Sequence, residues 1–450
     1  MTCRRLPFRR AALAGLGLAL LAGCADTPGA VDPAAEAPGT IASARAEPRV
    51  STRLTETAFG QSIAQATLSS PDRLAAAARV REAEAGLRAE TGAFRPQVSL
   101  GAEATTRIGG GSDATPLVRV RQLIYDGGAT RGRQAAAQAR VVQSESDRLG
   151  ALAALTYEAV EVWHDLRAAR QRLALAERNQ RAHRQFLRQI EDRAAAGAGA
   201  GPEVLTARSR LANATTRAVE AQARVERASA AYVRAFGQPP RGDLAAAPPA
   251  PALPAGAEAE VIAASPRLRS LQAAVKAAEG DLAAARAARR PAISLGGTGR
   301  RGGDGRRVDA GLSLEIDYDL GTQGRRAAAA QAAEARLQGL EAERESVTRD
   351  IARALADLRA DQRAGAARLT AARDAVAANE AAVEAAREQF SIGRQSLSGL
   401  LDAQRDLFEA SEALIAAERE LALTGYAALS LTGDILDAFG IMARAPAWDE

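Results

Sequence analysis

The sequence predicts a mainly α-helical protein with a small β part, built by an internal tandem duplication. Ala, Arg, Glu and Leu dominate its 450 residues and only 3% are aromatic, a composition typical of long packed helices. A few short segments alternate apolar and polar residues, which is the period of a β-strand. The same order of elements then occurs twice along the chain, which indicates a duplication.

Residues 1–23 are predicted to be a lipoprotein signal peptide. Four arginines precede the apolar stretch Ala11–Leu20, which is too short to span a membrane. The stretch ends in Leu21-Ala22-Gly23-Cys24, which resembles a bacterial lipoprotein cleavage site and makes Cys24 the expected lipidation site. Ala25 follows, where an Asp in lipoproteins favours retention in the inner membrane, so we expect an outer-membrane destination. Residues 24–50 have no periodicity and predict a flexible tether.

The first repeat is expected over residues 51–236. Within it, Ser70 and Pro71 mark a helix start, as the cap and the first-turn residue. The expected elements are a helical segment from about Leu54 to Thr91, strands at 95–107 and 115–126, a long helix from Ala129 to about Ala196, a tip turn that begins at Gly197, and a shorter helix that ends near Phe236.

The second repeat is expected over residues 258–437, with strands at 291–300 and 307–319. Residues 237–257 contain six prolines and predict a linker between the repeats, and residues 438–450 are expected to form a C-terminal tail. Chance similarity between Ala-rich helices does not explain the specific matches between the repeats. These are Ser70-Pro71 with Ser265-Pro266, Arg95-Pro96 with Arg290-Pro291, and Tyr125-Asp126 with Tyr318-Asp319.

The strand predicted around residues 308–319 shows the alternation most clearly. Five apolar residues alternate there with polar or small ones: Val308, Ala310, Leu312, Leu314 and Ile316. The run is about as long as a tilted strand that crosses a bilayer, roughly 9–11 residues. Two strand pairs alone would leave two open edges, so we expect strands from other copies of the chain to complete a closed barrel.

The last helices carry a sustained heptad pattern. Apolar doublets recur every seven residues at Leu400-Leu401, Leu407-Phe408, Leu414-Ile415, Leu421-Ala422, Ala428-Leu429 and Ile435-Leu436. Such heptads predict coiled-coil packing. A doubled apolar position suits a helix with neighbours on both sides, and a ring of helices is one such arrangement.

Composition and motifs argue against other classes of protein. The net charge is only +5, and arginines are interleaved with acidic residues, so solvated helix faces are favoured over nucleic-acid binding. His164 and His183 have no partners at metal-ligand spacing, and the Gly-rich turns lack the Lys-Ser/Thr of a phosphate-binding loop. We therefore expect no enzyme activity, no cofactor and no metal.

The chain resembles the TolC-like outer membrane efflux and secretion channels over nearly all of its mature length. The most specific match is the run from Gln389 to Gln404, and the strand start Pro96–Leu100 and the turn Tyr125–Gly128 support it. The resemblance implies a homotrimer in which each chain gives four strands to an outer-membrane β-barrel and its helices to a long periplasmic α-barrel. It implies that the five apolar residues of 308–316 face lipid and that Tyr125 and Tyr318 belong to an interfacial aromatic girdle.

The same resemblance implies a periplasmic gate at the helix tips. Members of the family close there by inward bending of the second helix pair, held by a Tyr, an Arg and two Asp side chains. In this chain the corresponding residues are Phe390, Gln395, Gly399 and Asp402, so only Asp402 matches. Gly393 and Gly197 mark the two tip turns, and Glu203 is the first-repeat counterpart of Gly399. A solvated helix-surface carboxylate is the alternative interpretation of Asp402.

The predicted function is that of an outer-membrane exit duct, lipid-anchored and extending into the periplasm. It would receive substrates from an inner-membrane pump through a periplasmic adaptor, in drug or metal efflux or in type I protein secretion. Two alternatives are a periplasmic coiled-coil adaptor and a structural lipoprotein without a pore. An adaptor would carry one hairpin and a small β domain, and a structural lipoprotein has no need of amphipathic strand pairs. The sequence does not predict the substrate, the type of pump or the resting state of the tip.

Overall fold

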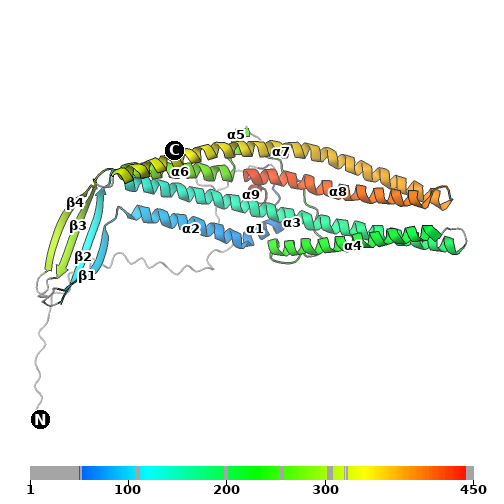
Figure 1. Cartoon of the computed structure of the whole chain (residues 1–450), viewed down its shortest axis with the longest axis horizontal. Helices are drawn as coiled ribbons and strands as arrows, with labels where there is room; N and C mark the ends of the chain where they lie inside the picture. The colour runs from blue at the N-terminus through cyan, green and yellow to red at the C-terminus, as the bar shows by residue number, and fades with distance from the viewer. Residues whose placement is uncertain are drawn as a thin grey trace, which may run out of the picture. The chain divides into compact units, whose positions relative to one another are not determined.

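The computed structural model describes residues 50, 53–106, 112–196, 201–253, 258–301, 308–318, 320 and 323–441 (Figure 1). The predicted signal peptide, Cys24 and Gly197 lie outside these residues. The described elements, in chain order, are α1 (Ala58–Ser69), α2 (Pro71–Gly92), β1 (Gln97–Thr106), β2 (Ser112–Tyr125), α3 (Ala129–Ala195), α4 (Gly201–Phe236), α5 (Glu258–Ala263), α6 (Pro266–Ala287), β3 (Ala292–Arg301), β4 (Val308–Asp317), α7 (Gln323–Ser391), α8 (Leu397–Thr432) and α9 (Ile435–Ala438). The chain is mostly helical and internally duplicated, as the sequence predicts.

Local sequence signals set several helix ends. The Ser70 side chain accepts a hydrogen bond from the Asp72 amide at the start of α2, with Pro71 in the first turn, as predicted. At the start of α3, the Asp126 carboxylate accepts bonds from the amides of Gly128 (3.0 Å) and Thr130 (2.6 Å). Gly127 and Gly128 have φ of 69° and 100°, which explains two consecutive glycines in this turn. The Tyr-Asp-Gly-Gly motif is therefore a strand-to-helix connection.

Two very long helices organise the helical part. Helix α3 has 67 residues and α7 has 69, each roughly 100 Å long. Helices α2 and α4 both pack against α3, while α6 and α8 pack against both α3 and α7. In Figure 1, α2 and α4 follow one another along α3, and α6 and α8 follow one another along α7. Each long helix is thus covered by two short ones.

The crossing of α3 and α6 depends on small residues. A Cβ atom added to Gly132 would lie 2.6 Å from the Ala284 amide nitrogen, and one added to Gly280 would lie 2.7 Å from that of Ala136. No side chain larger than hydrogen fits at either glycine without separating the two backbones. The first repeat therefore meets the second repeat here at backbone distance.

The four strands form one antiparallel sheet in the order β1-β2-β3-β4. The predicted strand bounds differ from the observed ones by up to three residues, since β2 begins at Ser112 rather than 115 and β4 ends at Asp317 rather than 319. The register also shifts between Leu123 and Tyr125, where β2 pairs with β3 through a bulge. The bulge lies next to the turn that leads into α3.

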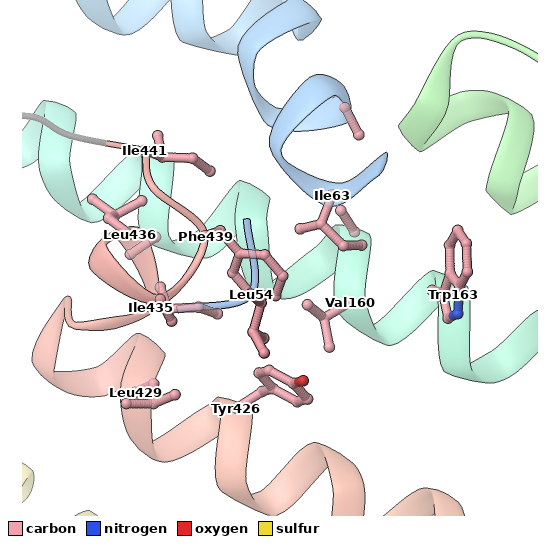
Figure 2. Packing of buried hydrophobic residues seen from close by; sticks show 14 of the residues in the cluster. Leu54, Ile63, Val160, Trp163, Tyr426, Leu429, Ile435, Leu436, Phe439 and Ile441 are labelled. Atoms are coloured by element: carbon pink, nitrogen blue, oxygen red, sulfur yellow. The ribbon is translucent and has the colours of Figure 1, made fainter. Parts of the chain in front are cut away.

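The main hydrophobic core joins the two ends of the described chain (Figure 2). Phe59 of α1 packs edge-on against Trp163 of α3 and Phe439, with ring centroids 5.4 and 5.7 Å away. Phe439 and Ile441, at the start of the predicted C-terminal tail, are buried in this core. The last residue of the predicted tether, Val50, is also buried there, and its amide donates to the Asp437 carboxylate.

The Pro-rich linker packs against the helices along its described part. The indole nitrogen of Trp163 donates to the carbonyl of Ala245, and the Tyr426 hydroxyl donates to the carbonyl of Pro248 at 2.9 Å. Arg170 donates to the carbonyl of Gly242. Hydrogen bonds from two buried aromatic side chains thus hold the described part of the linker against the helices. Among the described residues, no helix has both the length and the apolar character needed to cross a membrane.

Candidate functional site

One face of the sheet is apolar and exposed. The strand register places apolar side chains of all four strands on this face, and the large exposed ones are Val98, Leu100, Val118, Leu295, Val308, Leu312, Leu314 and Ile316. Leu100 is 81% exposed and Leu312 is 86% exposed. The five residues predicted to face lipid all lie here, Ala310 included. An apolar face of this extent is costly in water and marks a surface that another phase or molecule covers.

The opposite face of the sheet is polar. Arg121 of β2 forms an ion pair with Glu315 of β4 at 3.5 Å, and its Nε donates to the Ser294 hydroxyl of β3. Ser313 lies opposite Gly296 on this face. Both outer strands, β1 and β4, have one edge without a partner within the described sheet. The sheet is therefore two-sided in polarity and open at both edges.

The two predicted interfacial tyrosines lie at the helical end of the sheet. Tyr125 ends β2 and is paired with Ile293 beyond the bulge, which places it on the apolar face with Ile316. Tyr318 follows β4 directly. The two residues are 48% and 46% exposed, respectively. Each tyrosine therefore lies at the rim of the apolar face and stays partly open to solvent, and its place in an interfacial girdle remains a prediction.

The tip of the second hairpin, α7–α8, is built by a glycine turn and a serine cap. Gly393 has φ of 75°, and the Ser396 side chain accepts a bond from the Gly399 amide at 3.2 Å. A Cβ atom on Gly399 would lie 2.2 Å from the side-chain nitrogen, Nε2, of Gln395. The Gln395 side chain thus occupies the space beside Gly399. The structure brings these predicted tip residues together, while Glu203 is exposed in the first turn of α4.

Asp402 lies between two arginines. Its Oδ1 is 3.9 Å from Arg210 of α4 and 3.5 Å from Arg405 one turn along α8. The Asp402 side chain is 48% exposed. It therefore faces the seam between the first hairpin (α3–α4) and the second, with one side open to solvent.

Arginine–aromatic contacts join the two hairpins, and sequence reasoning missed them. Arg193 of α3 lies over the ring of Phe390 of α7 at 5.0 Å, and Arg387 of α7 lies over the ring of Phe186 of α3 at 5.6 Å. Each contact is worth about 0.5–1 kcal/mol when exposed. The available signal was an aromatic residue near the tip of each long helix in a chain with only 3% aromatics.

An apolar cluster underlies these contacts. Its buried members are Phe186, Ile190, Ala207, Ala386, Leu397, Leu400 and Leu401, with Phe390 packed against it. The cluster draws on α3, α4, α7 and α8, so the second hairpin is docked on the first at the tip. Further along the seam, Arg419 of α8 pairs with Asp165 and Glu161 of α3. Buried apolar area and polar contacts therefore hold the same seam.

Together, the long paired hairpins and the two-faced open sheet define a class of mainly helical proteins with a small amphipathic sheet that another molecule or phase must cover. The family model described as outer membrane efflux protein matches residues 62–238 and 259–432. The chain therefore belongs to the outer membrane efflux protein family. The two matched segments correspond to the two repeats, which agrees with the duplication.

Individual relatives agree with this assignment. The outer membrane efflux protein BepC of Brucella suis biovar 1 (strain 1330) is 26% identical over 355 residues, which cover 76% of this chain and 77% of BepC. The structure of the outer-membrane channel OprN matches with a TM-score of 0.76 at 24% identity, covering 83% of this chain and 89% of OprN. The open state of the Neisseria gonorrhoeae MtrE outer membrane channel matches with a TM-score of 0.75 at 20% identity, covering 88% and 93%. The fold is that of solved outer-membrane channels.

Proposed function

We propose that this protein is the outer-membrane exit duct of a tripartite export system and acts as a homotrimer. The observation that carries the proposal is the four-stranded sheet, which has one exposed apolar face and two unpaired edges. Three copies would pair β1 of each chain with β4 of the next and close a twelve-stranded barrel. Closure removes the open edges, and lipid covers the apolar face.

The polar face of the sheet would then line a wet channel. Arg121, Ser294 and Glu315 would stand on its wall, and the rows of helices would continue the duct through the periplasm. Substrates would arrive from an inner-membrane pump through a periplasmic adaptor. Drug or metal efflux is favoured by the efflux proteins among the relatives, and type I secretion is the second candidate.

Two further features belong to this proposal. Cys24 would carry the lipid that anchors the chain to the outer membrane. The docked second hairpin would keep the periplasmic tip closed at rest, through the apolar cluster, the two arginine–aromatic contacts and the Asp402–Arg210 pair. Three copies of Asp402 would form a carboxylate ring that favours cations.

The lipid-facing assignment can be tested with neighbouring residues of one strand. Leu312→Arg places a charge on the apolar face and should cost roughly 2–4 kcal/mol if the site is near the bilayer midplane. Ser313→Arg places the same charge on the polar face, opposite Gly296, and should be tolerated. The measurement is the amount of heat-resistant trimer in outer membranes and its conductance in planar bilayers.

The control for this pair is the total amount of each variant in the cell, because it separates failed insertion from poor expression. We expect the Leu312 variant to accumulate outside the membrane and the Ser313 variant to conduct. Equal assembly of the two would show that β4 does not face lipid. A monomeric wild-type protein without conductance would exclude the channel.

A further inference from the structure

A small, partly open cavity lies in the seam between the hairpins, next to the Asp402–Arg210 pair. Helices α3, α4 and α8 surround it, and each contributes side chains about one turn apart. The cavity has a volume of about 50 Å³ and is lined by Asn179, His183, Arg210, Asn213, Ala214, Arg217, Leu401 and Arg405. Such a volume holds a few water molecules or one small ion. The cavity joins both hairpins.

Two of the lining side chains carry buried polar atoms without partners. His183 and Asn179 are each only 7% exposed, and neither the Nδ1 of His183 nor the Oδ1 of Asn179 has a hydrogen-bond partner within the part of the chain that the structure describes. An unpaired buried polar atom costs about 1–3 kcal/mol. Native structures nearly always satisfy such atoms with a protein group, a water or a ligand. Two orphaned atoms beside one cavity therefore indicate an occupant that forms hydrogen bonds.

The charge around the cavity favours a negative occupant. Three guanidinium groups line it, and each presents several N–H donors. Arg405 forms ion pairs with Asp406 and Glu409, and Asp402 forms ion pairs with both Arg405 and Arg210. Arg217 has no carboxylate within ion-pair distance among the described residues, and its guanidinium lies over the Phe408 ring at 5.0 Å. Of the three arginines that line the cavity, Arg217 is therefore the one whose charge is left without a carboxylate partner among the described residues.

The protonation state of His183 is compatible with the positive charge of the neighbouring arginines. Burial lowers the pKa of His183, and the nearby Arg210 and Arg217 lower it further. The imidazole is therefore neutral at pH 7 and can place an N–H on Nδ1. The amide of Asn179 can present its NH₂ group to the cavity by a half-turn of its terminal group. Both side chains can then act as donors toward an anion.

We propose that this cavity binds one small monovalent anion, chloride in the cell, between the two hairpins. Water would satisfy the orphaned atoms but would leave Arg217 without a counter-ion, and the small volume favours a monatomic anion. The bound anion would link α4 to α8 and stabilise their packing. The binding itself goes beyond the proposed export function and does not depend on it.

Bromide is the probe for the site, because its anomalous scattering identifies it in crystals of the full-length protein. Crystals grown in sodium bromide should show an anomalous peak among His183, Arg210 and Arg217. The peak should disappear in Arg217→Gln. The matched control is Arg208→Gln on the same helix, where Arg208 pairs with Glu191 at 2.8 Å and does not line the cavity. This control should keep the peak.

A second measurement needs no crystal. Thermal unfolding in sodium chloride is compared with sodium gluconate at equal ionic strength, because gluconate is too large for the cavity. Chloride should raise the Tm of the wild type in a saturable manner, and Arg217→Gln should weaken the apparent chloride affinity at least tenfold. Asp402→Asn should tighten it, because a competing carboxylate is lost.

The proposal is overturned if wild-type crystals show no bromide peak in the cavity and chloride and gluconate give equal Tm values. It is also overturned if the peak survives Arg217→Gln. A protein that binds bromide here but does not conduct would contradict the proposed channel and leave the anion site standing. A conducting protein with an empty cavity would contradict the anion site and leave the proposed channel standing.

Discussion

At the scale of single residues, the burial of His164 determines its protonation state. His164 is 6% exposed, and its ring lies 6.1 Å from that of Phe59 and 6.2 Å from that of Tyr426. Its Nε2 has no hydrogen-bond partner among the residues described here by the structure. Burial lowers the pKa of His164 to about 4, with help from Arg167 and Arg419 and against the opposing effect of Asp165. The native state therefore holds this imidazole neutral.

The low pKa predicts a loss of stability in acid. The unfolded chain binds a proton at His164 below about pH 6.5, whereas the folded chain binds it only near pH 4. Stability therefore falls as the pH drops through this window, by up to about 3 kcal/mol from this residue. Denaturant unfolding of the wild type and of His164→Gln should be compared from pH 7.5 to 4. The variant should have a lower free energy of unfolding than the wild type at pH 7.5, but this free energy should fall less between pH 7.5 and 4. If the free energies of unfolding of the two proteins fell in parallel with pH, the prediction would be contradicted.

At the scale of elements, glycines control how closely the two repeats approach. Gly132 and Gly280 lie inside helices, where glycine lowers helix stability by roughly 1 kcal/mol relative to alanine. The close crossing of α3 and α6 explains why they are tolerated, because a Cβ at either position would meet backbone atoms at under 3 Å. The local cost to each helix is therefore offset by packing between helices.

Two alanine substitutions separate these effects. Gly280→Ala should destabilise the protein by about 1–3 kcal/mol, because it overpacks the crossing. Gly86→Ala in α2 is the matched control, since nothing lies within 4 Å of its added Cβ, and it should stabilise the protein by up to about 1 kcal/mol. Thermal unfolding of both variants measures the difference. Stabilisation by Gly280→Ala would show that α3 and α6 can separate without cost.

At the scale of the whole molecule, weak contacts between the hairpins set the proposed resting state of the tip. Each arginine–aromatic contact and the 3.9 Å Asp402–Arg210 pair are individually small, since exposed ion pairs are worth about 0–1 kcal/mol. Repeated along the seam and in three copies, they would add to the buried cluster. A tip held this way would open when a partner supplies modest binding energy.

The two residues of this pair should behave differently in single-channel recordings. Asp402→Ala removes both the pair and the carboxylate, so it should raise the open fraction and reduce cation selectivity. Arg210→Gln breaks the same pair but keeps the carboxylate, so it should raise the open fraction with selectivity retained. Unchanged selectivity in Asp402→Ala would mean that Asp402 is a solvated surface residue and does not line the pore.

Much of this architecture follows from the sequence, because its signals are local. The period-two alternation at Val308–Ile316 predicts a two-faced strand, and heptads such as Leu400-Leu401 and Leu407-Phe408 predict a packed helix. Caps and turns act within about four residues, so Ser70 and the Tyr125–Gly128 turn mark helix starts without any knowledge of the fold. The Arg-Pro and Tyr-Asp matches also reveal the duplication.

Only the tertiary structure decides which distant surfaces meet. No local pattern after residue 437 predicts the burial of Phe439, because Phe439 packs against Phe59 of α1, far away in the chain. The glycine crossing, the Arg193–Phe390 contact and the cavity around His183 likewise join segments from separate helices. A helix period shows which face is apolar but not the partner or its axial register. Those are set by the summed packing of side chains between elements, which no local pattern encodes.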